Sequence, residues 1–133
     1  MRRVFFDTDP VYNCTRIEFP SANNEFSNLP ETAQDVRLVE DSEIPTDRTF
    51  RNAWKPDLTV DFQKAKVIAH EKRRAMRSSE LAPLDEIIAK QIPGNNPQQV
   101  ESQRQVIRDI YTAMQTAIDA AQDVVAIKTA LGL

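Results

Sequence analysis

Few side chains in this sequence have the types and spacing that catalysis or metal binding requires. His70 is the only histidine, and in the run His-Glu-Lys-Arg-Arg the residue Arg74 stands where a zinc protease needs its second histidine. The single cysteine, Cys14, has no histidine near it in the sequence, which favours a half-buried structural thiol over a nucleophile. We therefore expect no enzyme activity, no cofactor, no bound metal and no small-molecule substrate.

A cluster of charged and aromatic residues between Pro45 and Pro56 is more informative. An arginine can stack on the ring of a tryptophan, and a carboxylate can hold that arginine in place. One interpretation is a corner that locks a sheet onto a helix, and the other is a surface for a partner protein. We call this cluster the joint residues: Asp47, Arg48, Phe50, Arg51 and Trp54.

Aromatic residues are concentrated near the N-terminus, where five of the nine in the chain fall within the first 26 residues. A small sheet cannot bury that many large rings, so some are expected to form an apolar surface for a partner. These residues are Phe5, Phe6, Tyr12, Phe19 and Phe26.

The overall composition excludes several classes of protein. The net charge of −3 argues against a nucleic-acid-binding protein, and the basic run from Lys64 to Arg77 is interpreted as a solvated helix face. With only two glycines the chain has no glycine-rich phosphate loop. It has no apolar run of the roughly 20 residues that a membrane-spanning helix needs and no signal peptide, so cytoplasmic localisation is expected.

Short strands are predicted in the first part of the chain. Residues 14–19 alternate apolar and polar side chains, and residues 2–8 and 36–40 are also strand-like. Residues 50–55 and 58–60, joined by Pro56 and Asp57, are expected to form a short hairpin. Residues 20–34 are expected to be a polar loop.

Helices are predicted in the second part. Asp61 is a candidate N-cap, Ser78 to Pro83 is expected to break or kink the first helix, and the helix then resumes to about Gln91. Asn96 and Pro97 form a start signal for the next helix. Whether that helix continues unbroken to Leu131 is left open, because the region from Thr112 to Thr116 is a weaker helix former.

The last long helix carries apolar residues at heptad spacing, which is typical of helices that pack on other helices. The stripe is wide enough to contact both its hairpin mate and a second chain, so we expect a homo-oligomer with two-fold or three-fold symmetry. The residues assigned to this contact are Ile107, Ile110, Met114, Ala117, Ile118 and Ala121.

The expected fold class is therefore α+β, with a small antiparallel β module followed by a helical hairpin of two or three helices. The predicted organisation has three parts: a partner-binding β module at 1–43, the joint at 44–60 and a helical oligomerisation module at 61–133.

The sequence of the joint resembles that of a known family. The run Ile-Pro-Thr-Asp-Arg-Thr-Phe-Arg-Asn-Ala-Trp at residues 44–54, followed by Val-Asp-Phe-Gln-Lys-Ala at 60–65, is similar to small proteins from the tail-fibre regions of tailed phages. They are often called tail-fibre assembly proteins or chaperones. The resemblance covers residues 38–77, and the chain departs from the family pattern by having no glycine between Trp54 and Val60.

The resemblance implies a non-enzymatic chaperone that binds a phage tail fibre in the host cytoplasm and helps it to fold and trimerise. The five N-terminal aromatic residues would then contact the fibre, and a homotrimer would match the three-fold symmetry that is usual in fibres. The alternative is a permanent virion component, such as a fibre adaptor or baseplate protein.

Overall fold

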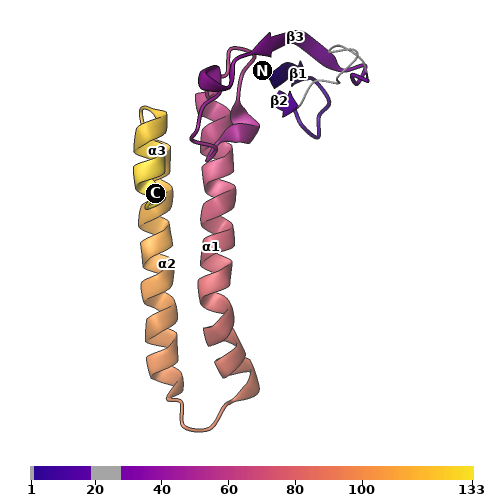
Figure 1. Cartoon of the computed structure of the whole chain (residues 1–133). Helices are drawn as coiled ribbons and strands as arrows, with labels where there is room; N and C mark the ends of the chain where they lie inside the picture. The colour runs from indigo at the N-terminus through magenta and orange to yellow at the C-terminus, as the bar shows by residue number, and fades with distance from the viewer. Residues whose placement is uncertain (1, 19–27) are drawn as a thin grey trace. The chain divides into compact units, whose positions relative to one another are not determined.

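The computed structural model describes residues 2–18 and 28–133. The chain begins with three strands, continues through two short 3-10 turns and ends with three helices (Figure 1). It divides into two compact units, Met1–Ala65 and Lys66–Leu133. The α+β class and the order of sheet before helices are therefore confirmed.

The sheet of the first unit has the strand order β2-β1-β3, with both pairs antiparallel. β1 (Arg2–Asp7) is the central strand and pairs with β2 (Cys14–Glu18) through a turn in which Asn13 has a φ of 42°. Asparagine tolerates this left-handed conformation better than most residues. Since β1 is central, its side chains have neighbours on both sides, and Val4 and Phe5 are fully buried.

β3 (Ala33–Val39) begins three residues before the predicted start at residue 36. Its pairing with β1 shifts register between Val4 and Phe6, and Asp35 in this region has a φ of 53°. The extra residue is a β-bulge, which twists an edge strand and disturbs its outer side. The alternation of side chains in the sequence does not reveal such a shift.

The expected hairpin at residues 50–55 and 58–60 is wrong. Half of the first segment forms a 3-10 turn, η2 (Arg51–Ala53). Neither segment forms a strand, and what remains of the hairpin is the isolated bridge between Trp54 and Val60 and a hydrogen bond from the Lys55 N–H to the Thr59 carbonyl at 2.8 Å. Another 3-10 turn, η1 (Asp41–Glu43), follows β3. Leu58 has a φ of 67° in the position where a glycine would relieve strain, and its side chain is buried.

α1 (Phe62–Lys90) begins at the predicted position, where the Asp61 carboxylate accepts a hydrogen bond from the Lys64 N–H at 3.1 Å. Of the break or kink predicted between Ser78 and Pro83, the break is wrong, because α1 continues through Pro83 to Lys90. Pro83 is exposed, so its ring meets no neighbouring element on its outer side.

α2 (Pro97–Ala120) starts as the sequence predicts: the Asn96 side chain accepts hydrogen bonds from the backbone N–H groups of Gln98 and Gln99, and Pro97 lies in the first turn. α2 does not continue to Leu131. It ends at Ala120, and Asp123 caps the short helix α3 (Val124–Ala130) with a hydrogen bond from the Ala126 N–H at 2.7 Å.

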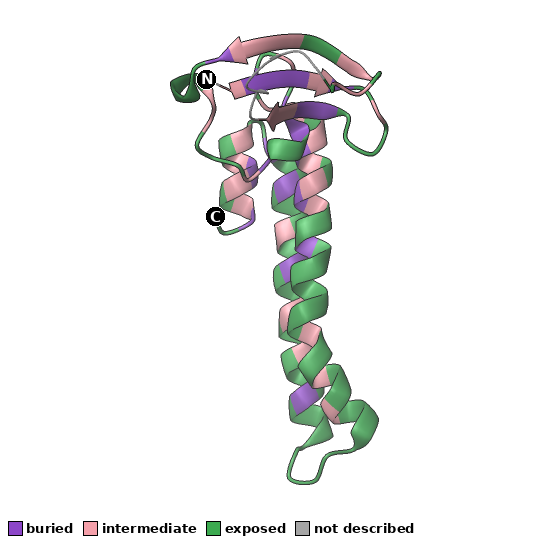
Figure 2. Ribbon diagram, turned by 45° about the vertical axis from the view of Figure 1, so that its right-hand side comes forward, coloured by how far each residue is buried: buried purple, intermediate pink, exposed green. Residues whose placement is uncertain are grey.

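Within the second unit, α1 and α2 run side by side in opposite directions (Figure 1). Polar contacts join the two helices along their length, among them Tyr111 to Glu80 at 2.6 Å, Arg104 to Asp85 at 2.7 Å and His70 to Asp119 at 2.8 Å. Most of the surface of both helices is exposed (Figure 2).

Candidate functional site

The joint lies along the outer edge of β2. The Thr15 N–H donates to the Trp54 carbonyl at 2.9 Å, and the Thr15 hydroxyl donates to the Lys55 carbonyl at 2.6 Å. Farther along the joint, the Asp61 N–H donates to the Ala53 carbonyl at 2.8 Å. These bonds hold the chain from Ala53 to Asp61 beside the first half of β2.

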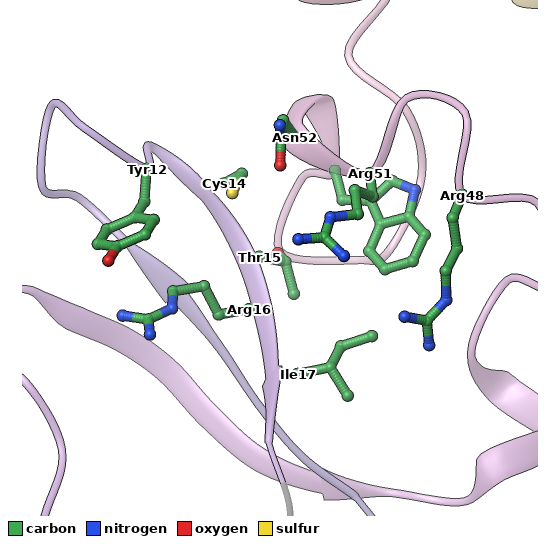
Figure 3. Close-up of a pocket in the computed structure, with 9 residues that line it drawn as sticks. Tyr12, Cys14, Thr15, Arg16, Ile17, Arg48, Arg51 and Asn52 are labelled. Atoms are coloured by element: carbon green, nitrogen blue, oxygen red, sulfur yellow. The ribbon is translucent and has the colours of Figure 1, made fainter.

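A hollow of about 280 Å³ lies between β2 and the joint. Figure 3 shows Thr15 and Ile17 on the side of β2 that faces Arg48 and Arg51, whereas Arg16 lies on the other side with Tyr12. Residues from both faces of β2 line the hollow, which places it at the outer edge of the strand. Its remaining lining residues are Cys14, Asn52 and Trp54.

The joint residues comprise two buried aromatic rings, one carboxylate that shapes a turn and two exposed arginines. Phe50 and Trp54 are both 2% exposed, so they belong to the core of the first unit. The Asp47 carboxylate accepts hydrogen bonds from the N–H and hydroxyl of Thr49, at 3.0 and 2.7 Å, which shapes the turn before η2. Arg48 and Arg51 are exposed. Among residues 2–18 and 28–133, neither has an ion-pair partner or lies on an aromatic ring, so the predicted stacking on Trp54 is not found.

Among the described residues of the first unit, the cation–π contacts involve another arginine. The Arg16 guanidinium lies 4.2 Å from the centroid of the Tyr12 ring and 5.4 Å from that of Phe5. Arg16 also pairs with the Asp7 carboxylate at 2.9 Å. Arg16 is therefore a structural residue that orders the turn and the sheet face, and it has little freedom to bind a partner.

The N-terminal aromatic residues do not form one exposed surface. Phe5 is fully buried, which corrects its assignment to a partner surface, because a buried ring cannot contact another protein. Phe6 is half-buried, and Tyr12 is 46% exposed beneath Arg16. Phe19 and Phe26 lie outside the described residues. A contact with a partner stays a prediction for Phe6 and Tyr12.

Cys14 is buried at the start of β2. Burial raises the pKa of its thiol, although Lys64, Arg16 and Arg51 oppose the shift. A raised thiol pKa lowers the fraction of reactive thiolate at neutral pH. The geometry therefore favours the structural role that the sequence suggests.

The residues assigned to self-association fall into two groups on α2. Ile118 is fully buried and Ala121, just beyond the helix, is nearly so. The assignment of both residues to self-association is wrong, because side chains that are buried within one chain have no exposed area with which to contact a second chain. Ile110 is 52% exposed, Ala117 is exposed, and Ile107 and Met114 are half-buried.

An exposed apolar face of α2 was only partly identified from the sequence. Val106 is 58% exposed and lies four residues before Ile110. Alanines continue the same heptad register toward the end of the helix, as the 4-3-4-3 spacing shows. We call this set the α2 face: Val106, Ile110, Ala113, Ala117 and Ala120. The α2 face shares Ile110 and Ala117 with the residues assigned from the sequence, but it has Val106, Ala113 and Ala120 in place of Ile107, Met114 and Ala121. Only the burial pattern distinguishes the two sets.

The single histidine lies among polar side chains of the helical unit. His70 contacts Asp119 and the Arg73 Nε, at 2.8 and 3.3 Å. No group of three His, Cys, Asp or Glu residues within 2–18 and 28–133 is arranged to hold a metal ion. In that same part of the chain, no helix combines the length and apolar character needed to cross a membrane.

Comparisons of the chain with protein-family models, with curated proteins and with solved structures found no match in any of the three.

Proposed function

We propose that this protein is a non-enzymatic helper of phage tail-fibre assembly, which binds a fibre subunit through its sheet unit and associates with further copies of itself through α2. The proposal starts from the resemblance of residues 44–54 to tail-fibre assembly proteins. The observation that carries it is that these residues lie beside the outer edge of β2 and leave Arg48 and Arg51 exposed there.

A fibre subunit that has not yet trimerised exposes strand edges and apolar faces, which are prone to aggregate. A second protein can cover such an edge by pairing with it as an added strand. The three-stranded sheet of this protein has two outer strands, β2 and β3, and the bulge at Asp35 disturbs β3. The β2 edge is therefore the better candidate for contact with the fibre.

Self-association would bring several bound fibre subunits together and raise their effective concentration. The second unit has little core of its own, since only eight of the residues from Lys66 to Leu133 are buried. A second chain packed on the α2 face would cover exposed apolar side chains and extend that core. Three-fold symmetry is proposed because it would match the fibre.

The test is co-expression with the fibre subunit encoded in the same tail region, followed by size-exclusion chromatography with mass measurement. We expect the fibre to be soluble and to co-elute with this protein, and to aggregate when expressed alone. A fibre that folds and trimerises equally well alone contradicts the proposal. Mass spectrometry of purified particles addresses the alternative, since stoichiometric presence in mature virions indicates a permanent structural part.

A further inference from the structure

The backbone of β2 is only partly paired on its outer side. The Thr15 N–H points away from β1 and donates to the Trp54 carbonyl at 2.9 Å. Backbone groups in a strand alternate in direction, so the N–H and C=O of Ile17, two residues later, face the same outer side. Among the described residues these two groups have no hydrogen-bond partner. The strand edge is therefore closed at Thr15 and open at Ile17.

The surroundings of this open edge are positively charged. Arg48 and Arg51 face it across the hollow (Figure 3), and neither forms an ion pair with a described residue. No Asp or Glu is among the residues that line the hollow. Asn52 adds an exposed amide that can donate or accept hydrogen bonds.

The hollow beside the open edge continues into a second hollow, so together they are longer than the binding of a single anion requires. An adjoining hollow of about 310 Å³ shares Ile17 and Arg48 with the first, and Ile44 and Pro45 give it an apolar side. Arg2 and Asp41 in this second hollow are paired with each other at 3.2 Å, so their charges are already matched. The uncompensated positive charge is therefore concentrated at Arg48 and Arg51, beside the open strand edge.

We propose that this edge binds an extended acidic segment of a partner protein. The segment pairs its backbone with the N–H and C=O of Ile17, and its carboxylates bind the guanidinium groups of Arg48 and Arg51. Backbone pairing supplies affinity that does not depend on sequence, and the two arginines select acidic side chains. The inference rests on the proposed function only for identifying that partner as the fibre.

The probe is a short synthetic peptide that alternates aspartate with valine, and its binding is followed by the fluorescence of Trp54. This is the only tryptophan in the chain, and it lines the hollow. We expect saturable binding that weakens with salt, because exposed charges are screened. A peptide with lysine in place of aspartate should not bind. Equal binding of inorganic phosphate or a single-stranded oligonucleotide would overturn the assignment to an acidic peptide.

The decisive variant is Arg48→Gln with Arg51→Gln, which should weaken peptide binding about tenfold or more, since charge-assisted hydrogen bonds are lost. Neither arginine has a structural ion pair, so the fold should be kept, as circular dichroism and thermal unfolding can verify. The matched control is Lys72→Gln with Arg74→Gln, which removes the same charge from exposed positions on α1 and should leave binding unchanged. If both variants bind alike, the inference is wrong.

Backbone pairing is tested separately by amide hydrogen exchange. The Ile17 N–H should exchange more slowly when the peptide is bound, because it then donates to the added strand. If Ile17 exchanges at the same rate while the peptide is bound, strand addition is excluded.

Measuring how the fibre subunit binds to the wild-type protein and to the arginine variant distinguishes a failure of this inference from a failure of the proposed function. If the wild-type protein and the variant both bind the fibre equally well, the proposed function stands and the fibre is excluded as the partner of this site. If the wild-type protein binds the acidic peptide at this edge but not the fibre, the site stands and the proposed function fails.

Discussion

The buried carboxylate of Asp7 accepts three hydrogen bonds from different parts of the first unit. Its side chain is 1% exposed and accepts hydrogen bonds from the Thr32 hydroxyl at 2.6 Å, the Asp9 N–H at 2.9 Å and Arg16 at 2.9 Å. The Thr32 hydrogen bond is the main cause of a lowered pKa for Asp7, with Asp9 and Arg16 contributing in the same direction and burial opposing them. The carboxylate joins β1, β2 and the turn before β3.

Asp7→Asn should lower the free energy of unfolding at neutral pH by about 1–3 kcal/mol, because charge-assisted bonds in a buried position are lost. The ordinary pKa of Asp7 is 3.8 and the folded-state pKa is lower, so this stabilisation is present above pH 3.8 and is lost as pH falls through the folded-state value. Urea unfolding followed by Trp54 fluorescence at a series of pH values measures both effects. Glu31→Gln, an exposed change of the same charge, should be neutral; equal losses in the two variants would contradict the prediction.

At the residue scale, the sequence singled out candidate residues but did not predict how buried each one is. Phe5 and Tyr12 are both aromatic, yet one is core and the other is partly exposed, since β1 is central and the turn is not. Arg48 and Arg51 were singled out as partners of Trp54, but their exposure at a strand edge depends on the path of the joint. That path is fixed by hydrogen bonds between Thr15 and the joint, across about 40 residues of sequence that no local pattern relates.

At the element scale, α1 departs from what a local signal in its sequence predicts. Proline inside a helix removes one backbone hydrogen bond and its ring crowds the preceding turn. The sequence therefore predicted a break or kink near Pro83, and the structure shows that the helix does not break there. By contrast, the starts of α1 and α2 were predictable, because their caps depend on residues within one turn.

Pro83→Ala should stabilise α1, since it restores a hydrogen bond within the helix at an exposed position. We expect the free energy of unfolding to rise by about 1–3 kcal/mol, measured by denaturant unfolding followed by helical circular dichroism. The matched control is Pro97→Ala in the first turn of α2, where proline is favourable; its effect should be within about 0.5 kcal/mol. A stabilisation no larger than that of the control would contradict the prediction.

The hydrogen bond from Tyr111 to Glu80 links α2 to α1. Burial, with a further contribution from Glu80, raises the pKa of Tyr111 to about 12. For an acid with a raised pKa, the neutral form stabilises the fold below the ordinary value of 10.0, and this contribution is lost as pH rises from there towards 12. The helical hairpin should therefore weaken in that alkaline range.

Tyr111→Phe should remove the hydrogen bond and lower the free energy of unfolding at neutral pH by about 0.5–1.5 kcal/mol. It should also reduce the alkaline loss of stability between pH 10 and 12. Thermal unfolding at several pH values measures this, and Tyr12→Phe is the control, since Tyr12 is in the other unit. An alkaline loss that persists unchanged in Tyr111→Phe would show that another group causes it.

At the scale of the whole molecule, each of the two units leaves a different kind of surface without a partner among the described residues. The sheet unit has an open edge at Ile17 with free positive charge beside it, and the helical unit has an apolar α2 face with no cover among the described residues. Helices that expose apolar residues at heptad spacing are stabilised by packing against another helix. A single chain therefore leaves two kinds of surface open, one for an extended segment and one for a helix.

If the α2 face joins copies of this chain, Val106→Asp with Ile110→Asp should abolish the oligomer, because charged residues at the centre of such a contact are desolvated without partners. Light scattering coupled to size-exclusion chromatography should then give the mass of a monomer, while circular dichroism stays helical, since both positions are exposed. Val125→Asp, which changes an exposed valine of α3 outside this face, should leave the oligomer intact. A wild-type protein that is monomeric throughout the micromolar range, or a double variant that keeps its oligomeric mass, would mean that the α2 face does not join copies of this chain.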